Sequence, residues 1–163
     1  MSLQFILDGY NILKHPLLTP LINKKIKNQR QALLEIIRTR RLTGSPKNKV
    51  IVVFDGYPDA EEAAGGNTNT AVGIIFSREM TADERIRRMV EHAGNRKNIV
   101  VVSDDKEIRF FVRASGAKPL CVKDFVADRK NSRKKEEDLW DAKLGFAQMH
   151  KINEELRQIW LEP

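Results

Sequence analysis

The segment FILDGYN, residues 5–11, decides the fold prediction, because three apolar residues lead directly into Asp8. Two later segments repeat this arrangement: VIVVFDG leads into Asp55, and IVVVSDD leads into Asp104 and Asp105. None of the three apolar runs alternates with polar residues, which is typical of strands that are buried on both faces of a parallel sheet. The sequence therefore predicts buried strands that each end at a carboxylate.

Helical segments alternate with apolar strands along the chain. Helices are predicted at residues 28–42, 81–95 and 105–116, where apolar side chains recur at helical spacing and glycine follows near the end. Two more apolar segments, residues 72–77 and 118–122, are predicted strands. This alternation predicts an α/β fold, a three-layer sandwich around a mainly parallel central sheet.

The whole chain, residues 1–163, is predicted to form a single domain, because its length suits one hydrophobic core. Residues 129–163 are predicted to form a basic segment and a C-terminal helix, which carries one apolar stripe. That stripe closes either the protomer's own core or a weak dimer, so a monomer and a weak dimer both stay open. Residues 61–72 are polar and rich in glycine, and they are predicted to be a mobile connection.

The charge of the chain narrows the choice of partners. There are 29 Lys and Arg residues against 22 Asp and Glu residues, which gives a formal charge of +7. Such a surplus is typical of proteins that bind RNA, DNA or an anionic membrane surface, and also of soluble basic domains without such a partner.

Cysteine content and hydropathy exclude several other classes of protein. Cys121 is the one cysteine, so an internal disulfide and a cysteine-based zinc site are excluded. It is predicted to be a small apolar residue in a buried strand. No apolar run reaches transmembrane length, and no basic residues precede the first apolar run as they would in a signal peptide. We expect a cytoplasmic protein with no membrane partner.

The acids that end the predicted strands share one edge of the sheet. Asp8, Asp55 and the pair Asp104 and Asp105 follow strands, and Asp83 opens a helix after another strand, so it can reach the same edge. Crowded carboxylates repel each other unless some are protonated or a cation lies among them. Oxygen ligands without histidine or cysteine favour Mg²⁺ or Mn²⁺, which can activate a water molecule. Together with the basic surface, these acids indicate phosphodiester hydrolysis in a nucleic acid.

Three motifs resemble the NYN-domain group of PIN-like ribonucleases, and most closely its YacP-type branch: DGYN, TADERI and VVVSDDKEI. The resemblance extends in order over about residues 5–125. It implies a parallel α/β fold in which clustered acidic residues hold a divalent metal for RNA cleavage. By position, it makes Asp8, Asp83 and Asp105 acids of that cluster and Asn11 the polar partner in the first motif.

The resemblance also bears on two further acids. Asp55 matches an additional acid that such sheets often place at the second strand. The position before Asp105 is usually small, neutral and polar in the family, whereas this chain has Asp104 there. Whether Asp104 or Asp105 is the closer ligand stays open, and Glu107 is a further candidate.

A purely structural role, in a turn or a helix cap, is an alternative explanation for each of these residues. Asp8 and Asp55 precede glycines and can form turns, although an acid that ends an apolar strand would then need several N–H partners. Asn11 can orient a ligand or cap a turn. Asp104, or Ser103 before it, can cap the following helix, but two adjacent acids exceed what capping needs.

The acids of TADERI have a similar alternative. Thr81 and Glu84 fit a capping box, and acids in a first helical turn suit the helix dipole. Glu84 is therefore assigned to capping, and Asp83 is assigned to the site.

Basic and aromatic residues on the same segments can contact a nucleic acid. The candidates for phosphate contacts are Arg85, Arg88, Lys106, Arg109, Arg133 and Lys134. Tyr10 and Tyr57 follow predicted acids and can stack on a base, although packing against a neighbouring helix is the favoured interpretation. The three histidines show no metal-ligand spacing, so none is assigned to the site.

The leading hypothesis is a metal-dependent endoribonuclease that acts on single-stranded or flexible RNA, with ribosome-associated mRNA as one candidate substrate. The alternative is a non-catalytic RNA- or ribosome-binding module on the same fold. A phosphatase of the haloacid dehalogenase type is disfavoured, because Tyr10 stands where its second acid is needed. No Walker-type phosphate loop is present, so no nucleotide cofactor is expected. A DNA flap nuclease shares the acidic-site chemistry and stays open.

Overall fold

The computed structural model of the chain describes residues 2–22, 25–26, 28–60 and 72–127. The chain divides into two units, Met1–Val126 and Ala127–Pro163, and every element described below belongs to the first. The predicted mobile connection, apart from Val72, lies outside the described residues, as do the predicted basic segment and C-terminal helix with Arg133 and Lys134. The single domain over the whole chain stays a prediction.

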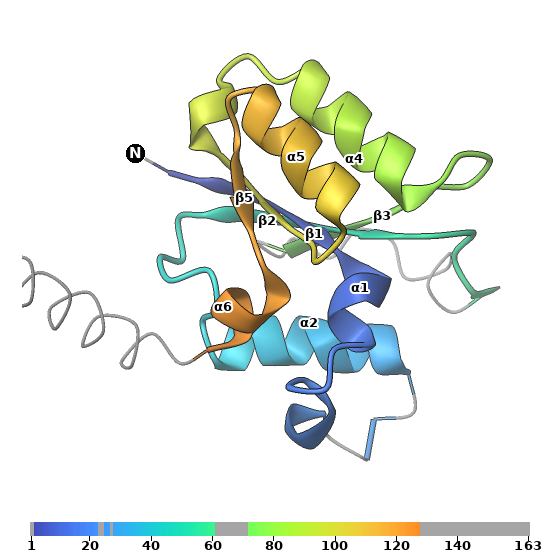
Figure 1. Cartoon of the computed structure of the whole chain (residues 1–163). Coiled ribbons are helices and arrows are strands. Elements are labelled where there is room, and N and C mark those ends of the chain that lie inside the picture. The colour runs from blue at the N-terminus through green and yellow to red at the C-terminus, as the bar shows by residue number, and fades with distance from the viewer. Residues whose placement is uncertain (1, 23–24, 27, 61–71, 128–163) are drawn as a thin grey trace, which may run out of the picture. The chain divides into compact units, whose positions relative to one another are not determined.

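Among the described residues, five parallel strands form the central sheet (Figure 1). They are β1 (Gln4–Asp8), β2 (Lys49–Phe54), β3 (Val72–Phe76), β4 (Ile99–Val102) and β5 (Lys118–Leu120). Their order is β3-β2-β1-β4-β5, and every neighbouring pair is parallel. In this register Leu7 lies between Val52 and Val102, so the first strand is at the centre. The predicted parallel sheet is confirmed, and the described sheet is parallel throughout.

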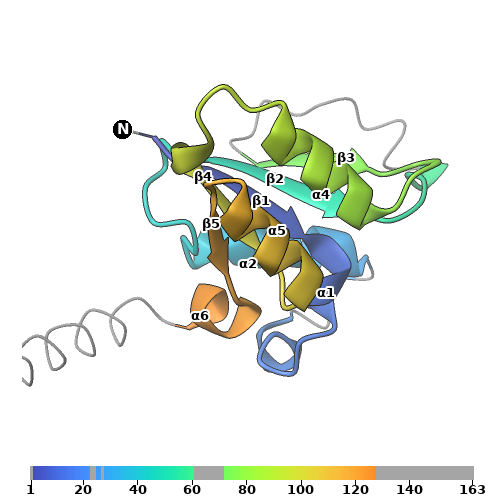
Figure 2. The same cartoon turned by 45° about the horizontal axis from the view of Figure 1, so that its top comes forward.

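Helices cover both faces of this sheet (Figures 1 and 2). One face carries α1 (Gly9–Leu13), α2 (Gln29–Thr39) and α6 (Val122–Val126), and the other carries α4 (Ala82–Glu91) and α5 (Lys106–Ala114). Short 3-10 helices lie in two connections, η1 (Thr19–Leu21) and η2 (Arg96–Asn98).

Side chains of β1 point alternately to the two faces of the sheet and pack against the helices of both layers. Leu7 packs in a cluster with Leu33 of α2, whereas its neighbour Ile6 packs with Ile86 of α4 and Ile108 of α5. All five side chains are shielded from solvent, so successive residues of one strand form the cores of opposite layers. The predicted three-layer sandwich is therefore confirmed.

The first strand passes into a helix without a loop, which the sequence pattern did not predict. Asp8 ends β1 and is also the N-cap of α1, where its carboxylate accepts a hydrogen bond from the backbone N–H of Asn11. Glycine is needed next, because a β-carbon at Gly9 would collide with the ring of Phe54. The DGYN motif thus starts a helix instead of forming a turn, and it holds Asp8 at the edge of the sheet.

Two predicted segments are shorter in the structure. The helix predicted over residues 28–42 ends at Thr39, and the exposed Arg40 is its C-cap. The predicted buried strand position of Cys121 is wrong, because β5 ends at Leu120 and Cys121 is half-exposed before α6.

The thiol of Cys121 makes a polar contact instead. It donates a hydrogen bond to the Asp124 carboxylate at 2.9 Å. Partial burial raises the pKa of the thiol, and the bond to Asp124 adds to the rise. Cys121 therefore stays protonated at the start of α6, a helix that sequence periodicity did not predict.

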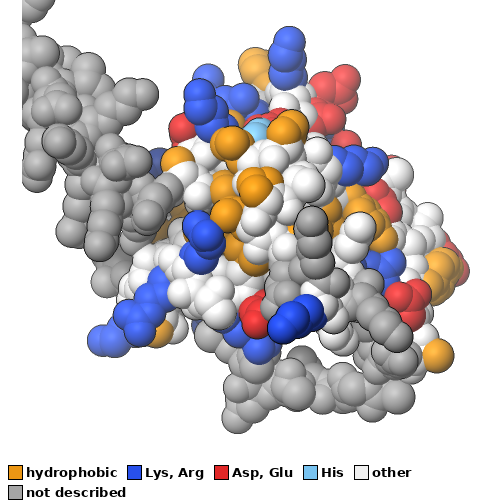
Figure 3. All heavy atoms as spheres, turned by 90° about the horizontal axis from the view of Figure 1, so that it is seen from below, with side chains coloured by type: hydrophobic (Ala, Val, Ile, Leu, Met, Phe, Trp, Pro, Cys, Tyr) orange, Lys and Arg blue, Asp and Glu red, His pale blue; other side chains and the backbone are white. Residues whose placement is uncertain are grey.

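Charge is dispersed on one face of the molecule. Figure 3 views the layer of α1, α2 and α6, where basic side chains are scattered among acidic and apolar ones. The net positive charge does not by itself mark a polyanion site on this face. Within the described ranges, none of the helices combines the length and the apolar character that crossing a membrane requires.

Candidate active site

The carboxyl ends of β1, β2 and β4 lie at one edge of the sheet, where the strand order reverses between β1 and β4. Open α/β sheets place their ligand sites beside such a reversal. A pocket of about 410 Å³ lies at this edge, and we call it the acidic pocket. Its lining includes four carboxylates, from Asp8, Asp55, Asp83 and Asp104, together with Tyr10, Asn11, Lys14 and His15.

Asp8 is the buried acid of the acidic pocket, with 7% of its surface exposed. Its Oδ1 accepts from the backbone N–H of Asn11 at 3.3 Å, and its Oδ2 accepts from the hydroxyl of Ser103 at 3.3 Å. Burial raises the pKa of Asp8 to about 6, and the charges of Asp83 and Asp55 contribute to the rise. The two hydrogen bonds therefore offset only part of the free energy lost when the ionised carboxylate is buried.

Asp55 links the end of β2 to the start of α4. Its Oδ1 accepts from the backbone N–H of Ala82 at 2.6 Å and from the hydroxyl of Ser77 at 3.4 Å. The Ser77 hydroxyl also accepts from the N–H of Gly56 at 3.1 Å. These bonds hold an otherwise exposed acid beside the first turn of α4, where the helix dipole favours negative charge.

Asp83 faces the acidic pocket from the first turn of α4. Partial burial raises its pKa, and the charges of Asp105 and Asp55 raise it further, whereas Arg87 lowers it. The predicted capping box is confirmed beside it, because Thr81 Oγ1 and the Glu84 carboxylate each accept the other residue's backbone N–H. Capping therefore occupies Glu84 and leaves Asp83 at the pocket.

The two adjacent acids after β4 have different surroundings. Asp105 is the N-cap of α5, and its Oδ1 accepts two backbone N–H groups of the first turn at 2.7 and 3.2 Å. Asp104 lines the acidic pocket, and its Oδ1 accepts the backbone N–H of Val122 at 2.9 Å. The alternative explanation that Ser103 or Asp104 caps this helix is excluded, because Asp105 is the N-cap.

Asn11 and His15 hold Asp104 from the α1 side. The Oδ1 of Asn11 accepts the backbone N–H of Asp104 at 3.2 Å. The Nε2 of His15 lies 3.7 Å from the Asp104 carboxylate, and its Nδ1 accepts the backbone N–H of Leu17 at 3.2 Å. Nδ1 therefore acts as an acceptor, and Nε2 is the ring nitrogen that faces Asp104.

The structure brings most of the predicted site residues together. Asp8, Asn11, Asp55, Asp83 and Asp104 line one pocket, although they come from four separate parts of the chain. Asp105 is not among the residues that line the pocket, and it acts on Asp83 through its charge. The roles of all six as ligands or catalytic groups stay predictions.

Sequence reasoning missed three side chains of this site. Ser103 is fully buried, and its hydroxyl donates to Asp8 while accepting from the backbone N–H of Asp105 at 3.2 Å. A serine that ends an apolar strand directly before two acids was a usable signal. Lys14 and His15 had none, because their place at the pocket depends on α1, which was not predicted.

The donor chemistry of the acidic pocket fits a hard divalent cation. Carboxylate oxygens are the ligands that Mg²⁺ and Mn²⁺ prefer, and a cation would relieve the repulsion that contributes to the raised pKa of Asp8. In the part of the chain that the structure describes, however, no group of three or more His, Cys, Asp or Glu side chains is arranged to hold a metal ion. Asp55 and Asp104 each accept a hydrogen bond from a different backbone N–H group, of Ala82 and Val122 respectively. The pocket thus presents suitable donors without a converged ligand set.

The predicted phosphate-binding residues on the described helices differ in exposure. Arg88 and Lys106 are exposed on α4 and α5. Arg85 and Arg109 are half-buried, and the Nε of each is buried without a hydrogen-bond partner among the described residues. Their contacts with phosphate stay predictions.

The two tyrosines near the acids behave differently. Tyr10 packs edge-to-face on Phe54 with ring centroids 5.3 Å apart, and its hydroxyl accepts from Arg30 of α2 at 2.7 Å. Packing is therefore confirmed for Tyr10. For Tyr57 the same prediction is wrong, because 60% of its surface is exposed.

Comparison with known proteins identifies the family of this chain. Its sequence matches the model of the YacP-like NYN domain over residues 5–162. A mutant form of Rae1 (YacP) from Bacillus subtilis is similar in structure, with 26% identity, a TM-score of 0.57 and coverage of 85% of this chain and 80% of that chain. A second structure of Rae1 (YacP) from Bacillus subtilis, 24% identical, shares the fold with a TM-score of 0.56 over 98% of this chain and 94% of that chain. The search of curated proteins finds no match. On the family match and the fold that it shares with these structures, the chain belongs to the family of YacP-like NYN domains.

Proposed function

We propose that this protein is a metal-dependent endoribonuclease that hydrolyses phosphodiester bonds in RNA. One observation carries the proposal: four carboxylates from separate segments line one pocket, and the pKa of the most buried acid, Asp8, is raised to about 6. Perturbed acids in a pocket at the reversal of strand order mark a candidate active site. Membership of the YacP-like NYN family and the formal charge of +7 favour RNA as the substrate.

The acids that line the pocket would hold the metal, and we assign this role to Asp8, Asp55, Asp83 and Asp104. A bound Mg²⁺ or Mn²⁺ supplies positive charge to phosphate oxygens and lowers the pKa of an attacking water. Asp105 caps α5 and adds negative charge near Asp83. The cation would offset the negative charge that develops on the phosphate oxygens and the leaving oxygen, and the acids would hold the cation in place.

Other side chains of the pocket would position the substrate. The amide nitrogen of Asn11 is a donor for a phosphate oxygen, since its Oδ1 already accepts from Asp104. Lys14 is exposed and lines the pocket, so its ammonium group can neutralise a phosphate. His15 places its Nε2 3.7 Å from the Asp104 carboxylate, beside the space where a phosphate would bind. These contacts would place a phosphodiester against the acids.

The proposal also covers the kind of RNA that is cleaved, the oligomeric state of the protein and its location in the cell. Single-stranded or flexible RNA is the proposed substrate, and ribosome-associated mRNA is one source of it. No nucleotide cofactor takes part in this chemistry. A monomer or weak dimer in the cytoplasm is the proposed form of the protein.

The test combines metal removal with matched substitutions. Labelled RNA is incubated with purified protein in Mn²⁺, Mg²⁺ or EDTA, and the products are followed on a gel. Asp8→Asn and Asp83→Asn are expected to abolish cleavage, as is EDTA. Glu91→Gln is the control, because this exposed acid lies at the opposite end of α4 from Asp83. Cleavage that persists undiminished in Asp8→Asn and Asp83→Asn would contradict the mechanism.

A non-catalytic RNA- or ribosome-binding module is the second candidate. The observation in its favour is that no group of three candidate ligands in the described ranges is arranged to hold a metal ion. Such a module would bind RNA equally well with EDTA and with Mn²⁺, and it would leave the RNA intact under every metal. Asp8→Asn would then bind RNA as well as the wild type does.

A further inference from the structure

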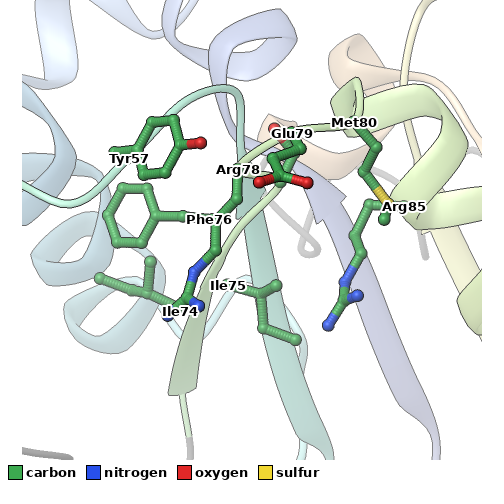
Figure 4. Close-up of a pocket in the computed structure, with 9 residues that line it drawn as sticks. Tyr57, Ile74, Ile75, Phe76, Arg78, Glu79, Met80 and Arg85 are labelled. Atoms are coloured by element: carbon green, nitrogen blue, oxygen red, sulfur yellow. The ribbon is translucent and has the colours of Figure 1, made fainter.

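A second pocket lies beside β3, the strand at one edge of the sheet. It has a volume of about 740 Å³, which is within the range of roughly 300–1,000 Å³ for sites that bind small molecules. We call it the β3 pocket. Figure 4 shows Arg78 and Arg85 extending alongside β3 with Ile75 between them, and Tyr57 and Phe76 at the Arg78 end.

The β3 pocket adjoins the acidic pocket through shared segments. Asp55 lines the acidic pocket and Tyr57, two residues later, lines the β3 pocket. On α4, Asp83 lines the acidic pocket and Arg85, two residues later, lines the β3 pocket. The hydrogen bond from Ser77 to Asp55 crosses the boundary between them. The two pockets therefore adjoin each other near the ends of β2 and β3.

The aromatic side chain of the β3 pocket is available for stacking. Tyr57 is 60% exposed, and it makes no ring contact with another described residue. Phe76, by contrast, already packs on Phe54 with ring centroids 6.2 Å apart and lies under the guanidinium of Arg30. Every nucleobase presents a face that can stack on such an exposed ring.

One basic group of the β3 pocket has a donor that is unpaired among the described residues. Arg85 has a buried Nε with no hydrogen-bond acceptor among the described residues, and a buried donor of this kind calls for a ligand or a water. Arg78 is exposed, and its backbone is in the left-handed region at φ 58°. A left-handed conformation at a non-glycine residue is often found at a ligand site. Glu79 is the one acid of this lining, so the pocket carries a net positive charge.

We propose that the β3 pocket is a nucleotide subsite that binds one unit of the substrate RNA next to the cleaved phosphodiester. The base stacks on Tyr57, and the phosphate contacts Arg78 and Arg85. This inference rests on the proposed function for its substrate class, because RNA is the polyanion that the acidic pocket would cleave. It assigns a binding role to residues outside the acidic pocket.

The test measures binding of a fluorescent single-stranded oligoribonucleotide by anisotropy, in EDTA so that no cleavage occurs. Tyr57→Ala is expected to weaken binding about tenfold without changing the salt dependence. Arg78→Gln is expected to weaken binding and to reduce the slope of log K against log salt by about 1. Phe110→Ala and Arg38→Gln are the matched controls, because Phe110 is 77% exposed on α5 and Arg38 is exposed on α2.

Cleavage in Mn²⁺ separates this inference from the proposed function. Tyr57→Ala is expected to raise KM about tenfold and to leave kcat within about twofold. If the wild type cleaves RNA but Tyr57→Ala and Arg78→Gln match their controls, the subsite is overturned and the nuclease stands. If both variants weaken RNA binding but no protein cleaves RNA with any metal, the nucleotide-binding role of the β3 pocket stands and the nuclease is overturned. Circular dichroism of every variant confirms that the fold is intact.

Discussion

Two groups of acids lie at the same edge of the sheet, and they have opposite effects on the stability of the fold. Asp105 and Glu84 accept backbone N–H groups at the first turns of α5 and α4, where an acid stabilises the helix. Asp8 and Asp83 lie in the acidic pocket, and burial raises the pKa of each, so their ionised forms destabilise the fold. Acids that stabilise the fold can therefore be distinguished from acids that destabilise it when ionised, although the sequence around all four is similar.

The neighbours Asp83 and Glu84 give the sharpest test of this distinction. Asp83→Asn is expected to lower the rate of RNA cleavage in Mn²⁺ by at least about 100-fold, because even partners of metal ligands are worth roughly 10- to 100-fold. Glu84→Gln is expected to keep the rate within about threefold, since glutamine also completes a capping box. Single-turnover cleavage measures both rates. Equal losses in the two variants would remove the distinction.

Asp8 provides a second test, through stability instead of activity. Its pKa is about 6 in the folded protein and 3.8 ordinarily, so the folded state favours the protonated form. That stabilisation is full below about pH 3.8 and is lost as the pH rises through 6. Asp8→Asn is therefore expected to stabilise the metal-free protein by about 2–3 kcal/mol at pH 8 and by little at pH 4.

Urea unfolding in EDTA at the two pH values measures this difference. Asparagine is a fair replacement, because it keeps an acceptor for the Asn11 N–H and can still bond to Ser103. Glu91→Gln is the control, and its effect is expected to be the same at both pH values. A gain at pH 8 that does not exceed the gain at pH 4 would show that the burial of Asp8 is not destabilising.

The fold could be predicted from the sequence where local pattern determined it. Continuous apolar runs predicted the buried strands, and the capping box of Thr81 and Glu84 predicted the start of α4, because both signals lie within a few residues. The short helices α1 and α6 could not be predicted. Each has five residues, too few to be stable alone, and depends on burying Ile12, Val122 and Phe125 against the sheet.

The sequence predicted the acids of the site, but it did not predict the residues that hydrogen-bond to them. The acids stand out because each ends an apolar strand or opens a helix. The partners do not, since the hydrogen bond from Ser103 to Asp8 joins residues 95 apart and that from Asn11 to Asp104 joins residues 93 apart. Which of Asp104 and Asp105 faces the pocket was also undetermined, because a shift of one residue at the end of β4 exchanges their roles.

This pair of acids gives a third prediction, of smaller effect. Asp104→Asn is expected to lower the cleavage rate about tenfold, less than Asp83→Asn, because Asp104 is exposed and its Oδ1 already accepts the backbone N–H of Val122. Asp105→Asn is expected to lower it by less than about threefold, since asparagine is an equally good N-cap. Cleavage rates in Mn²⁺ at equal protein stability measure both effects. A larger loss in Asp105→Asn would identify it as the closer ligand.

The smallest expected effect concerns the acids that stabilise the fold. Thr81→Ala removes the acceptor of the Glu84 N–H, so it is expected to lower the free energy of unfolding by about 1 kcal/mol. Its cleavage rate under saturating Mn²⁺ is expected to stay within about twofold of the wild type, because Thr81 does not line the acidic pocket. Urea unfolding and single-turnover cleavage on the same preparation check both values, and Thr81→Ser, which keeps the hydroxyl, is the control. A loss of cleavage without a loss of stability would mean that the start of α4 positions Asp83 for the reaction, and the capping acids would then belong to the site as well.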